Sequence, residues 1–151
     1  LHSTSRRQRQ MCIRDSHHIA HLYNYVGQPW RTQEIVDEVL HTLYFNNPDG
    51  LSGNEDCGQM SAWYILNAMG FYQVCPGKPV YSIGRPLFNE ATVHLKDGKS
   101  FKVIAHNNSR DNKYVRSIVL NGNKLETPFF THQDIVDGGT LELTMGSEPL
   151  K

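Results

Sequence analysis

The chain is organised around residues 53–64, which read GNEDCGQMSAWY. Glycines interrupt the first half of this stretch, so we expect it to form a loop. The second half places Met60, Trp63 and Tyr64 at the spacing of one helix face. The acidic pair Glu55 and Asp56 therefore lies on a loop directly before a helix N-terminus.

These polar residues have two explanations. A helix N-terminus favours acidic and short polar side chains, because its free N–H groups and its dipole attract negative charge, so Asp56 or Asn54 could be an ordinary N-cap. A cap needs one such residue, whereas Asn54, Glu55 and Asp56 follow one another and Gln59 comes soon after. A functional carboxylate site explains the cluster equally well, and the residues alone leave both explanations open.

The sequence on either side of the loop predicts three helices. The first covers residues 17–26 and ends at Gly27-Gln28-Pro29; its apolar stripe is Ile19, Leu22, Tyr23 and Val26. The second runs from about Trp30 to Tyr44, with the stripe Ile35, Val36, Val39, Leu40 and Leu43 and with Glu34, Asp37 and Glu38 facing outward. The third extends to Met69 and has Gly70 as its C-cap.

After Gly70 the pattern changes to short strands. We expect strands at residues 71–74, 80–83, 91–95, 100–104, 114–120 and 141–145, and a short helix at 131–136. Asp97-Gly98 and Asn121-Gly122 are typical hairpin turns. Many short strands separated by glycine turns indicate a sandwich. The expected organisation is α+β, with a helical part at residues 17–76 and a β-rich region at residues 77–151.

Residues 1–16, LHSTSRRQRQMCIRDS, show no apolar periodicity. A basic arm of this kind could indicate a nucleic-acid tail. The segment also resembles the translated sequencing adapters found at the ends of metagenomic gene fragments. We expect a disordered, non-native leader and exclude it from the fold.

Composition excludes several classes of protein and site. The 151 residues carry a formal net charge of zero, which gives no electrostatic footprint for nucleic acid, and no apolar run approaches the length of a membrane helix. Cys12, Cys57 and Cys75 lack metal-site spacing, and Cys57 and Cys75 are expected to be free buried thiols rather than a disulfide. His17 and His21 share a helix face, but further zinc ligands are not evident.

Residues 50–77, GLSGNEDCGQMSAWYILNAMGFYQVCPG, resemble the signature of glycoside hydrolase family 92. The segments before and after it resemble the same family at His17-His18-Ile19, Tyr23-Asn24-Tyr25, Gly27-Gln28-Pro29-Trp30, Thr32-Gln33, residues 81–88 (YSIGRPLF) and residues 138–141 (GGTL). The resemblance covers residues 17 to about 148.

The resemblance implies a fold and an activity. The fold would be the last helices of an (α/α)6 barrel followed by an antiparallel, β-sandwich-like region. The activity would be that of a calcium-dependent, inverting exo-α-mannosidase acting on mannose-containing glycans in the bacterial periplasm or outside the cell. This chain would be a C-terminal fragment, inactive alone, because the upstream part that supplies the general acid is missing.

The resemblance also assigns residues. Asp56 matches the general base; Glu55 is the second candidate, and Asn54 stands where some relatives carry another aspartate. An inverting enzyme needs two carboxyl groups roughly 6.5–9.5 Å apart, which adjacent Glu55 and Asp56 are not expected to provide. The substrate-binding candidates are His17, His18 and Gln59.

Other candidates remain less defined. The calcium ligands are unassigned, and Asn54, Asp56 and Gln59 are the nearby oxygen donors. Trp30 and Trp63 could stack on a sugar, although the apolar stripe favours a core position for Trp63. Arg85 and Asn108 are taken as ordinary polar residues. The alternative function is a non-catalytic carbohydrate-binding β-sandwich module.

Overall fold

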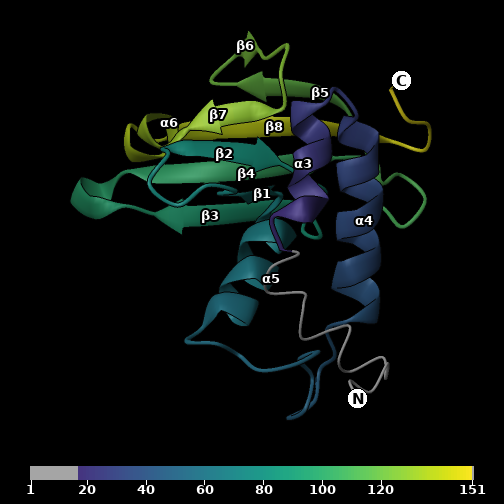
Figure 1. Ribbon diagram of the computed structural model, residues 1–151. Helices are drawn as coiled ribbons and strands as arrows, with labels where there is room; N and C mark the ends of the chain where they lie inside the picture. Colours follow the sequence, from purple (N-terminus) through teal and green to yellow (C-terminus); the bar gives the residue numbers. More distant parts are fainter. Residues whose placement is uncertain (1–16, 151) are drawn as a thin grey trace.

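The structure is a computed structural model that describes residues 17–150. Three helices come first: α3 (Ile19–Tyr25), α4 (Pro29–Thr42) and α5 (Gln59–Met69). Two β-sheets follow, and the helices pack on one side and one end of them (Figure 1). The α+β organisation is confirmed, and the expectation for residues 1–16 lies outside the described residues.

Local sequence explains where the helices begin and end. Pro29 occupies the first turn of α4, where its missing N–H costs nothing. Gly70 ends α5 in the left-handed conformation, with φ 103°, and its N–H donates to the carbonyls of Leu66 and Asn67. The predicted C-cap is therefore confirmed.

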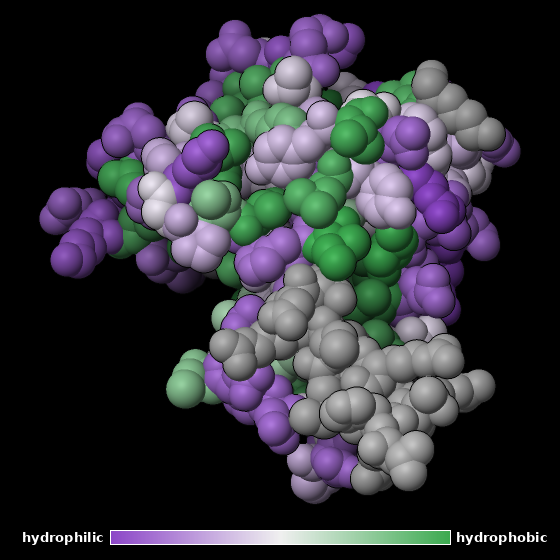
Figure 2. Space-filling view, in the orientation of Figure 1, coloured by the Kyte–Doolittle hydropathy of each residue, from purple (hydrophilic) through white to green (hydrophobic). Residues whose placement is uncertain are grey.

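The predicted orientation of α3 is wrong. Three of the four residues in the predicted apolar stripe, Ile19, Leu22 and Val26, are 51%, 47% and 67% exposed, and the fourth, Tyr23, is partly buried. His21 and Asn24 are buried instead. The inward face of α3 is polar because its side chains find hydrogen-bond partners on α5 and on the first sheet. Figure 2 shows the resulting hydrophobic surface over α3.

The strands form two sheets. The three-stranded sheet has the order β1 (Phe71–Tyr72), β2 (Val80–Ile83), β7 (Phe129–Thr131). The five-stranded sheet has the order β3 (Glu90–His94), β4 (Ser100–His106), β8 (Gly139–Gly146), β5 (Tyr114–Leu120), β6 (Asn123–Lys124). Because β4 and β8 run parallel, this sheet is mixed, and the expectation of a purely antiparallel region is wrong.

The predicted turns are confirmed. Asp97 and Gly98 have φ 61° and 72° and connect β3 to β4; Asn121 and Gly122 have φ 50° and 81° and connect β5 to β6. Positive φ at both central residues of Asn121-Gly122 suits the twist of a two-residue hairpin. Asp97 and Gly98 lie in a longer connection, which forms a 3-10 turn at Lys96–Gly98. The short helical insert is α6 (His132–Val136), which starts with a capping box between Thr131 and Asp134. Strand β7 was not predicted.

Two apolar clusters hold the elements together. One lies between the sheets and includes Phe71, Phe101 and Phe130, which make ring contacts with each other. The other joins the helices around Val36, Leu40 and Trp63, which are 0%, 3% and 1% exposed. None of the helices described combines the length and the apolar character that crossing a bilayer requires.

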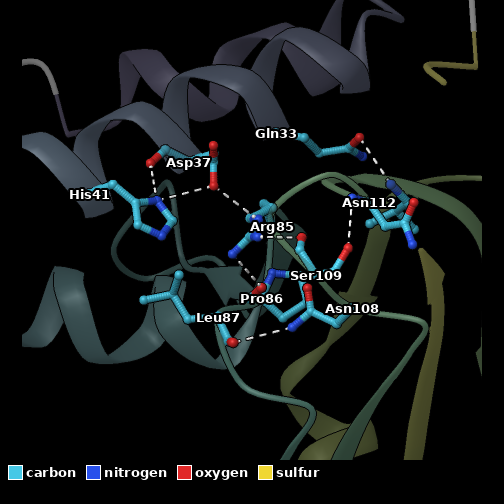
Figure 3. A network of polar contacts seen from close by, with 10 residues as sticks. Gln33, Asp37, His41, Arg85, Pro86, Leu87, Asn108, Ser109 and Asn112 are labelled. Atoms are coloured by element: carbon cyan, nitrogen blue, oxygen red, sulfur yellow. Dashed lines mark hydrogen bonds and ion pairs between the residues drawn. The ribbon is translucent and has the colours of Figure 1, made fainter. Parts of the chain in front are cut away.

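A polar contact joins α4 to the β region (Figure 3). The guanidinium of Arg85, 3% exposed, lies 3.1 Å from the Asp37 carboxylate and donates to the carbonyls of Pro86 and Ser109. The hydroxyl of Tyr114 donates to Glu34 at 2.8 Å. The outward orientation predicted for Asp37 and Glu34 is therefore wrong, and Arg85 is a buried interface cation rather than an ordinary polar residue.

Candidate active site

The loop before α5 has an unusual backbone. Asp56, Cys57 and Gly58 follow one another with φ 51°, 59° and 87°. Left-handed conformations are costly for residues with a Cβ, about 1–2 kcal/mol each. Such conformations concentrate at functional sites, where the surroundings hold them in place. Asp56 is exposed on this loop.

The structure shows which residue of the loop binds the start of α5. The N-cap of α5 is Gly58, which has no side chain to cap with, so neither Asn54 nor Asp56 is the cap residue. Instead, the Glu55 carboxylate accepts from the Ser61 N–H at 3.0 Å and from the Ser61 hydroxyl at 2.8 Å. Glu55 thus satisfies the helix N-terminus, and the N-cap explanation does not apply to Asp56.

The first turn of α5 is closed by the loop itself. The N–H groups of Gln59 and Met60 donate to the carbonyls of Asp56 and Glu55 at 3.3 and 3.2 Å. The hydroxyl of Tyr44 donates to the Met60 carbonyl at 3.1 Å. Burial, followed by the charge of nearby Glu55, raises the pKa of Tyr44, so this phenol stays neutral and fixes the start of the helix.

A hollow of about 590 Å³ begins where the loop meets α5. Two sequence-predicted residues, His18 and Gln59, lie in its wall. The rest of the lining is Ala62, Trp63, Leu66, Tyr72, Gln73 and Pro76. Amide and imidazole groups beside aromatic faces are suited to a polar ligand with apolar ring faces, such as a sugar. Asn54, Glu55 and Asp56 are not in the lining and lie on the loop that leads into Gln59.

Aromatic rings form one side of the hollow. Tyr72 contacts His18 at a centroid distance of 5.9 Å and Trp63 at 6.4 Å, and burial raises the pKa of its hydroxyl. Sequence reasoning missed Tyr72, because it read residues 71–74 only as a strand. Tyr72 lies two residues after the Gly70 cap, where the chain folds back along α5, and this position could have indicated that its ring lies beside the helix.

His17 lies on the other side of Trp63. Its ring stacks on the indole at 5.1 Å and lines a smaller hollow of about 190 Å³ with Ile19, Ala20, Tyr23, Ile35 and Val39. Burial, and secondarily the charge of His18, lowers the pKa of His17 to about 4. Both its ring nitrogens are buried without a hydrogen-bond partner among the described residues. His17 and His18 therefore face different hollows.

The two tryptophans also have different positions. Trp63 is 1% exposed, so its expected core position is confirmed, although its ring also contributes to the hollow. Trp30 lies at the start of α4 in a separate cleft with Gln33, Val115 and Leu125. It is not part of the lining that contains His18 and Gln59.

The described residues do not complete a calcium site. Asn54, Asp56 and Gln59 are oxygen donors, but calcium takes 6–8 oxygens and the Glu55 carboxylate is bound to Ser61. Over residues 17–150, no three His, Cys, Asp or Glu side chains gather where they could hold a metal ion. Cys57 and Cys75 are free, as expected, but exposed, so the prediction that they are buried is wrong.

Solved structures resemble this fold closely. A family GH92 alpha-mannosidase from Bacteroides thetaiotaomicron is 44% identical, with a TM-score of 0.83 over 88% of this chain and 18% of its own. The family GH92 inverting mannosidase from Bacteroides thetaiotaomicron VPI-5482 is 48% identical, with a TM-score of 0.81 over 87% of this chain and 18% of its own. The first enzyme has also been solved with mannoimidazole bound.

Sequence comparisons agree. An uncharacterized secreted glycosidase from Arthroderma benhamiae is 30% identical over 130 residues, which are 84% of this chain and 17% of that protein. The chain therefore spans less than a fifth of each of these relatives. The model of the glycosyl hydrolase family 92 catalytic domain matches residues 4–147, a range that includes most of the leader segment. This chain belongs to glycosyl hydrolase family 92.

Proposed function

We propose that this chain is part of an inverting, calcium-dependent exo-α-mannosidase. Helices α3, α4 and α5 would belong to an (α/α)6 barrel that other parts of the longer enzyme complete. The observation that carries the proposal is the loop before α5, which holds Asp56 in the left-handed conformation while Glu55 is bound to Ser61. The relatives named as an alpha-mannosidase and an inverting mannosidase support the substrate class and the stereochemistry.

In this mechanism Asp56 is the general base. An inverting glycosidase protonates the leaving oxygen with one carboxyl group and removes a proton from the attacking water with another, on opposite faces of the sugar. Glu55 is not the acid partner, because its two oxygens are occupied by Ser61 and it is adjacent to the base. The acid would come from another part of the enzyme. Asn54 offers an acceptor for the water but no charge.

The substrate would be a mannose-containing glycan outside the cytoplasm. His18 and Gln59 would bind hydroxyl groups, and Trp63 and Tyr72 would contact a sugar face. The mannoimidazole complex of a relative supports a mannose-type ligand, and the relative described as secreted supports a secreted or periplasmic location. Calcium would bind Asn54, Asp56 or Gln59 only together with oxygen donors from other parts of the enzyme. The bound ion would then bind hydroxyl groups of the sugar.

The alternative, a carbohydrate-binding module, finds no support on the open face of the five-stranded sheet. Strand pairing places polar and aliphatic residues side by side on this face: Thr92, His94, Lys102, Ile104, His106, Ser117, Val119, Thr140, Glu142 and Thr144. These positions contain no Trp, Tyr or Phe. Tyr114, which pairs with Gly146 on the same face, is buried and donates to Glu34, so it offers no free ring face. A sugar-binding platform normally uses such rings, because they present large amphipathic faces to the sugar.

The test uses a parent-length enzyme, in which residues 17–150 replace the matching segment of the Bacteroides thetaiotaomicron relative. We expect Asp56→Asn to lower kcat on an α-mannobiose by roughly 10²–10⁴-fold, the usual contribution of a general base. Glu55→Gln should lower it far less, because the amide still accepts from Ser61. Chelation of calcium should abolish activity, and added calcium should restore it.

Two results would contradict the proposal. If Asp56→Asn retains near-parental turnover while Glu55→Gln does not, the base is Glu55. If the chimera with all loop residues unchanged folds and binds mannose but hydrolyses no mannoside, the site is not catalytic. The 151-residue chain alone should show no measurable hydrolysis, since the proposed acid would come from another part of the enzyme.

A further inference from the structure

Polar side chains meet at the junction of α3, α5 and β2. His21, Asn67, Ser82 and Asn24 are 0%, 0%, 1% and 4% exposed. Buried polar groups are costly unless they are hydrogen-bonded, and these four bond to one another. The sequence did not indicate that His21 and Asn24 are buried, because the apolar stripe of α3 predicted that the other face of the helix points inward.

The directions of these hydrogen bonds are determined by the two backbone carbonyls at the ends. The Asn67 amide N–H donates to the Trp63 carbonyl at 2.9 Å, so the Asn67 Oδ1 must be the acceptor that faces His21 Nε2 at 2.8 Å. Nε2 therefore carries the hydrogen. In the neutral ring Nδ1 then has a lone pair, which accepts from the Ser82 hydroxyl at 3.0 Å.

The other end of the chain agrees with this tautomer. The Asn24 amide N–H donates to the Ile83 carbonyl at 2.8 Å and to Ser82 Oγ at 2.6 Å. Because Ser82 Oγ receives this hydrogen, its own hydrogen is available for His21. Each link thus has one donor and one acceptor, from Asn24 through Ser82, His21 and Asn67 to the Trp63 carbonyl.

His21 also contacts the wall of the candidate active site. Its ring lies 5.4 Å from the Tyr72 ring, and Tyr72 and Trp63 both line the 590 Å³ hollow. The Trp63 indole N–H donates to the His17 carbonyl at 3.1 Å, directly before His18. His21 itself is not in the lining, so it can act on a ligand only through these neighbours.

The end of β2 is shaped to fit the imidazole. A Cβ on Gly84 would lie 3.2 Å from His21 Cε1 and 3.6 Å from Asn67 Oδ1. Burial lowers the pKa of His21 to about 4, which agrees with a neutral ring at physiological pH. A Cβ at position 84 would therefore require a small shift of the His21 ring, whereas its distance from the Asn67 amide would be an ordinary van der Waals contact.

We infer that His21 is a positioning residue, which as the neutral Nε2–H tautomer fixes α3, α5 and β2 against one another and thereby holds Trp63, Tyr72 and His18 around the hollow. The consequence for substrate binding rests on the proposed function, whereas the tautomer and the hydrogen-bond chain do not. The first experiment therefore measures structure in this chain, and the second measures activity in the parent-length enzyme.

Nuclear magnetic resonance tests the tautomer and its effect on Trp63. Long-range ¹H–¹⁵N spectra at neutral pH should show hydrogen on Nε2 of His21 and none on Nδ1. His21→Leu removes the donor that faces Asn67 Oδ1 and the acceptor that faces the Ser82 hydroxyl, while Asn67 keeps its bond to Trp63 and Ser82 its bond from Asn24. It should accelerate hydrogen exchange of the Trp63 indole N–H by about tenfold or more. Trp30, the other tryptophan, is the internal control and should be unaffected. His21→Gln, which keeps a donor and an acceptor, should retain most of the protection.

If His21→Leu does not fold, Ser82→Ala removes one link without a large change of volume and should give the same change at Trp63. An Nδ1–H or doubly protonated ring, or unchanged exchange of Trp63 in the folded variants, would overturn the inference.

In the parent-length enzyme, His21→Leu should lower kcat/KM by roughly tenfold to a hundredfold, the cost of misplaced binding groups. The loss should appear mainly in KM, and His21→Gln should restore most of it. If the spectra show the expected tautomer but no variant of the enzyme has activity, the proposed function fails and the hydrogen-bond chain stands. If Leu and Gln variants lose kcat/KM equally, the positioning role fails.

Discussion

At the scale of the residue, His21 couples folding to pH. Burial lowers the pKa of its ring from 6.5 to about 4, whereas in the unfolded chain it takes up a proton near its ordinary pKa. Between these values the unfolded state binds more protons, so lowering the pH favours unfolding by up to about 1.4 kcal/mol per pH unit. Well above pH 6.5, roughly one unit or more, the ring is neutral in both states and contributes no slope.

Urea unfolding of the chain at pH 7 and at about pH 5 measures this effect. We expect the free energy of unfolding to fall at the lower pH, and the fall to be smaller in His21→Gln, which no longer titrates. His94→Gln, on the open face of the five-stranded sheet, is the matched control and should keep the parental difference. An equal fall in His21→Gln and the parent would show that His21 is not the group responsible.

At the scale of the element, the Arg85–Asp37 pair fixes α4 to the β region. Removing one partner of a buried pair leaves the other charge uncompensated, at a cost of roughly 3–5 kcal/mol. Asp37 keeps some solvent contact and its bond to His41, so we expect Arg85→Met to lower the free energy of unfolding by about 3 kcal/mol, the lower end of that range.

The matched control for this prediction is the Arg31–Glu34 pair on α4, in which the Arg31 side chain is 51% exposed. Arg31→Met should change stability by less than about 1 kcal/mol, because solvent screens surface pairs. Urea denaturation of both variants measures the two changes in the free energy of unfolding. Equal effects of the two substitutions would mean that Arg85 does not join the elements.

At the scale of the whole molecule, α3 leaves an apolar surface uncovered in the described structure (Figure 2). Leu22 and Val26 are 47% and 67% exposed, and contiguous surfaces of this kind promote association. We expect the 151-residue chain to self-associate, and the double substitution Leu22→Gln and Val26→Gln to shift it toward monomer in sedimentation velocity experiments.

Val136→Gln provides the comparison for this surface. Val136, on α6, is 44% exposed but lies away from α3, so its replacement should leave association unchanged. Association that is insensitive to the α3 substitutions would place the contact on another face.

Local sequence determined the elements of this protein. Glycine and proline positions end helices or permit positive φ through local backbone geometry alone, so Gly70, Asp97-Gly98 and Asn121-Gly122 could be placed without any tertiary contact. Strand periodicity likewise located the long strands, and the run around Asp56 identified the family and the candidate base.

The tertiary structure decided which faces those elements bury. Apolar periodicity assigned the wrong face to α3, because hydrogen bonds to Asn67 and Ser82 made His21 and Asn24 the buried side chains. The parallel pairing of β4 with β8 and the Arg85–Asp37 pair join residues far apart in the chain, and no local pattern encodes such partners. For the same reason the bond between Glu55 and Ser61 at the start of α5 became visible only in the folded structure.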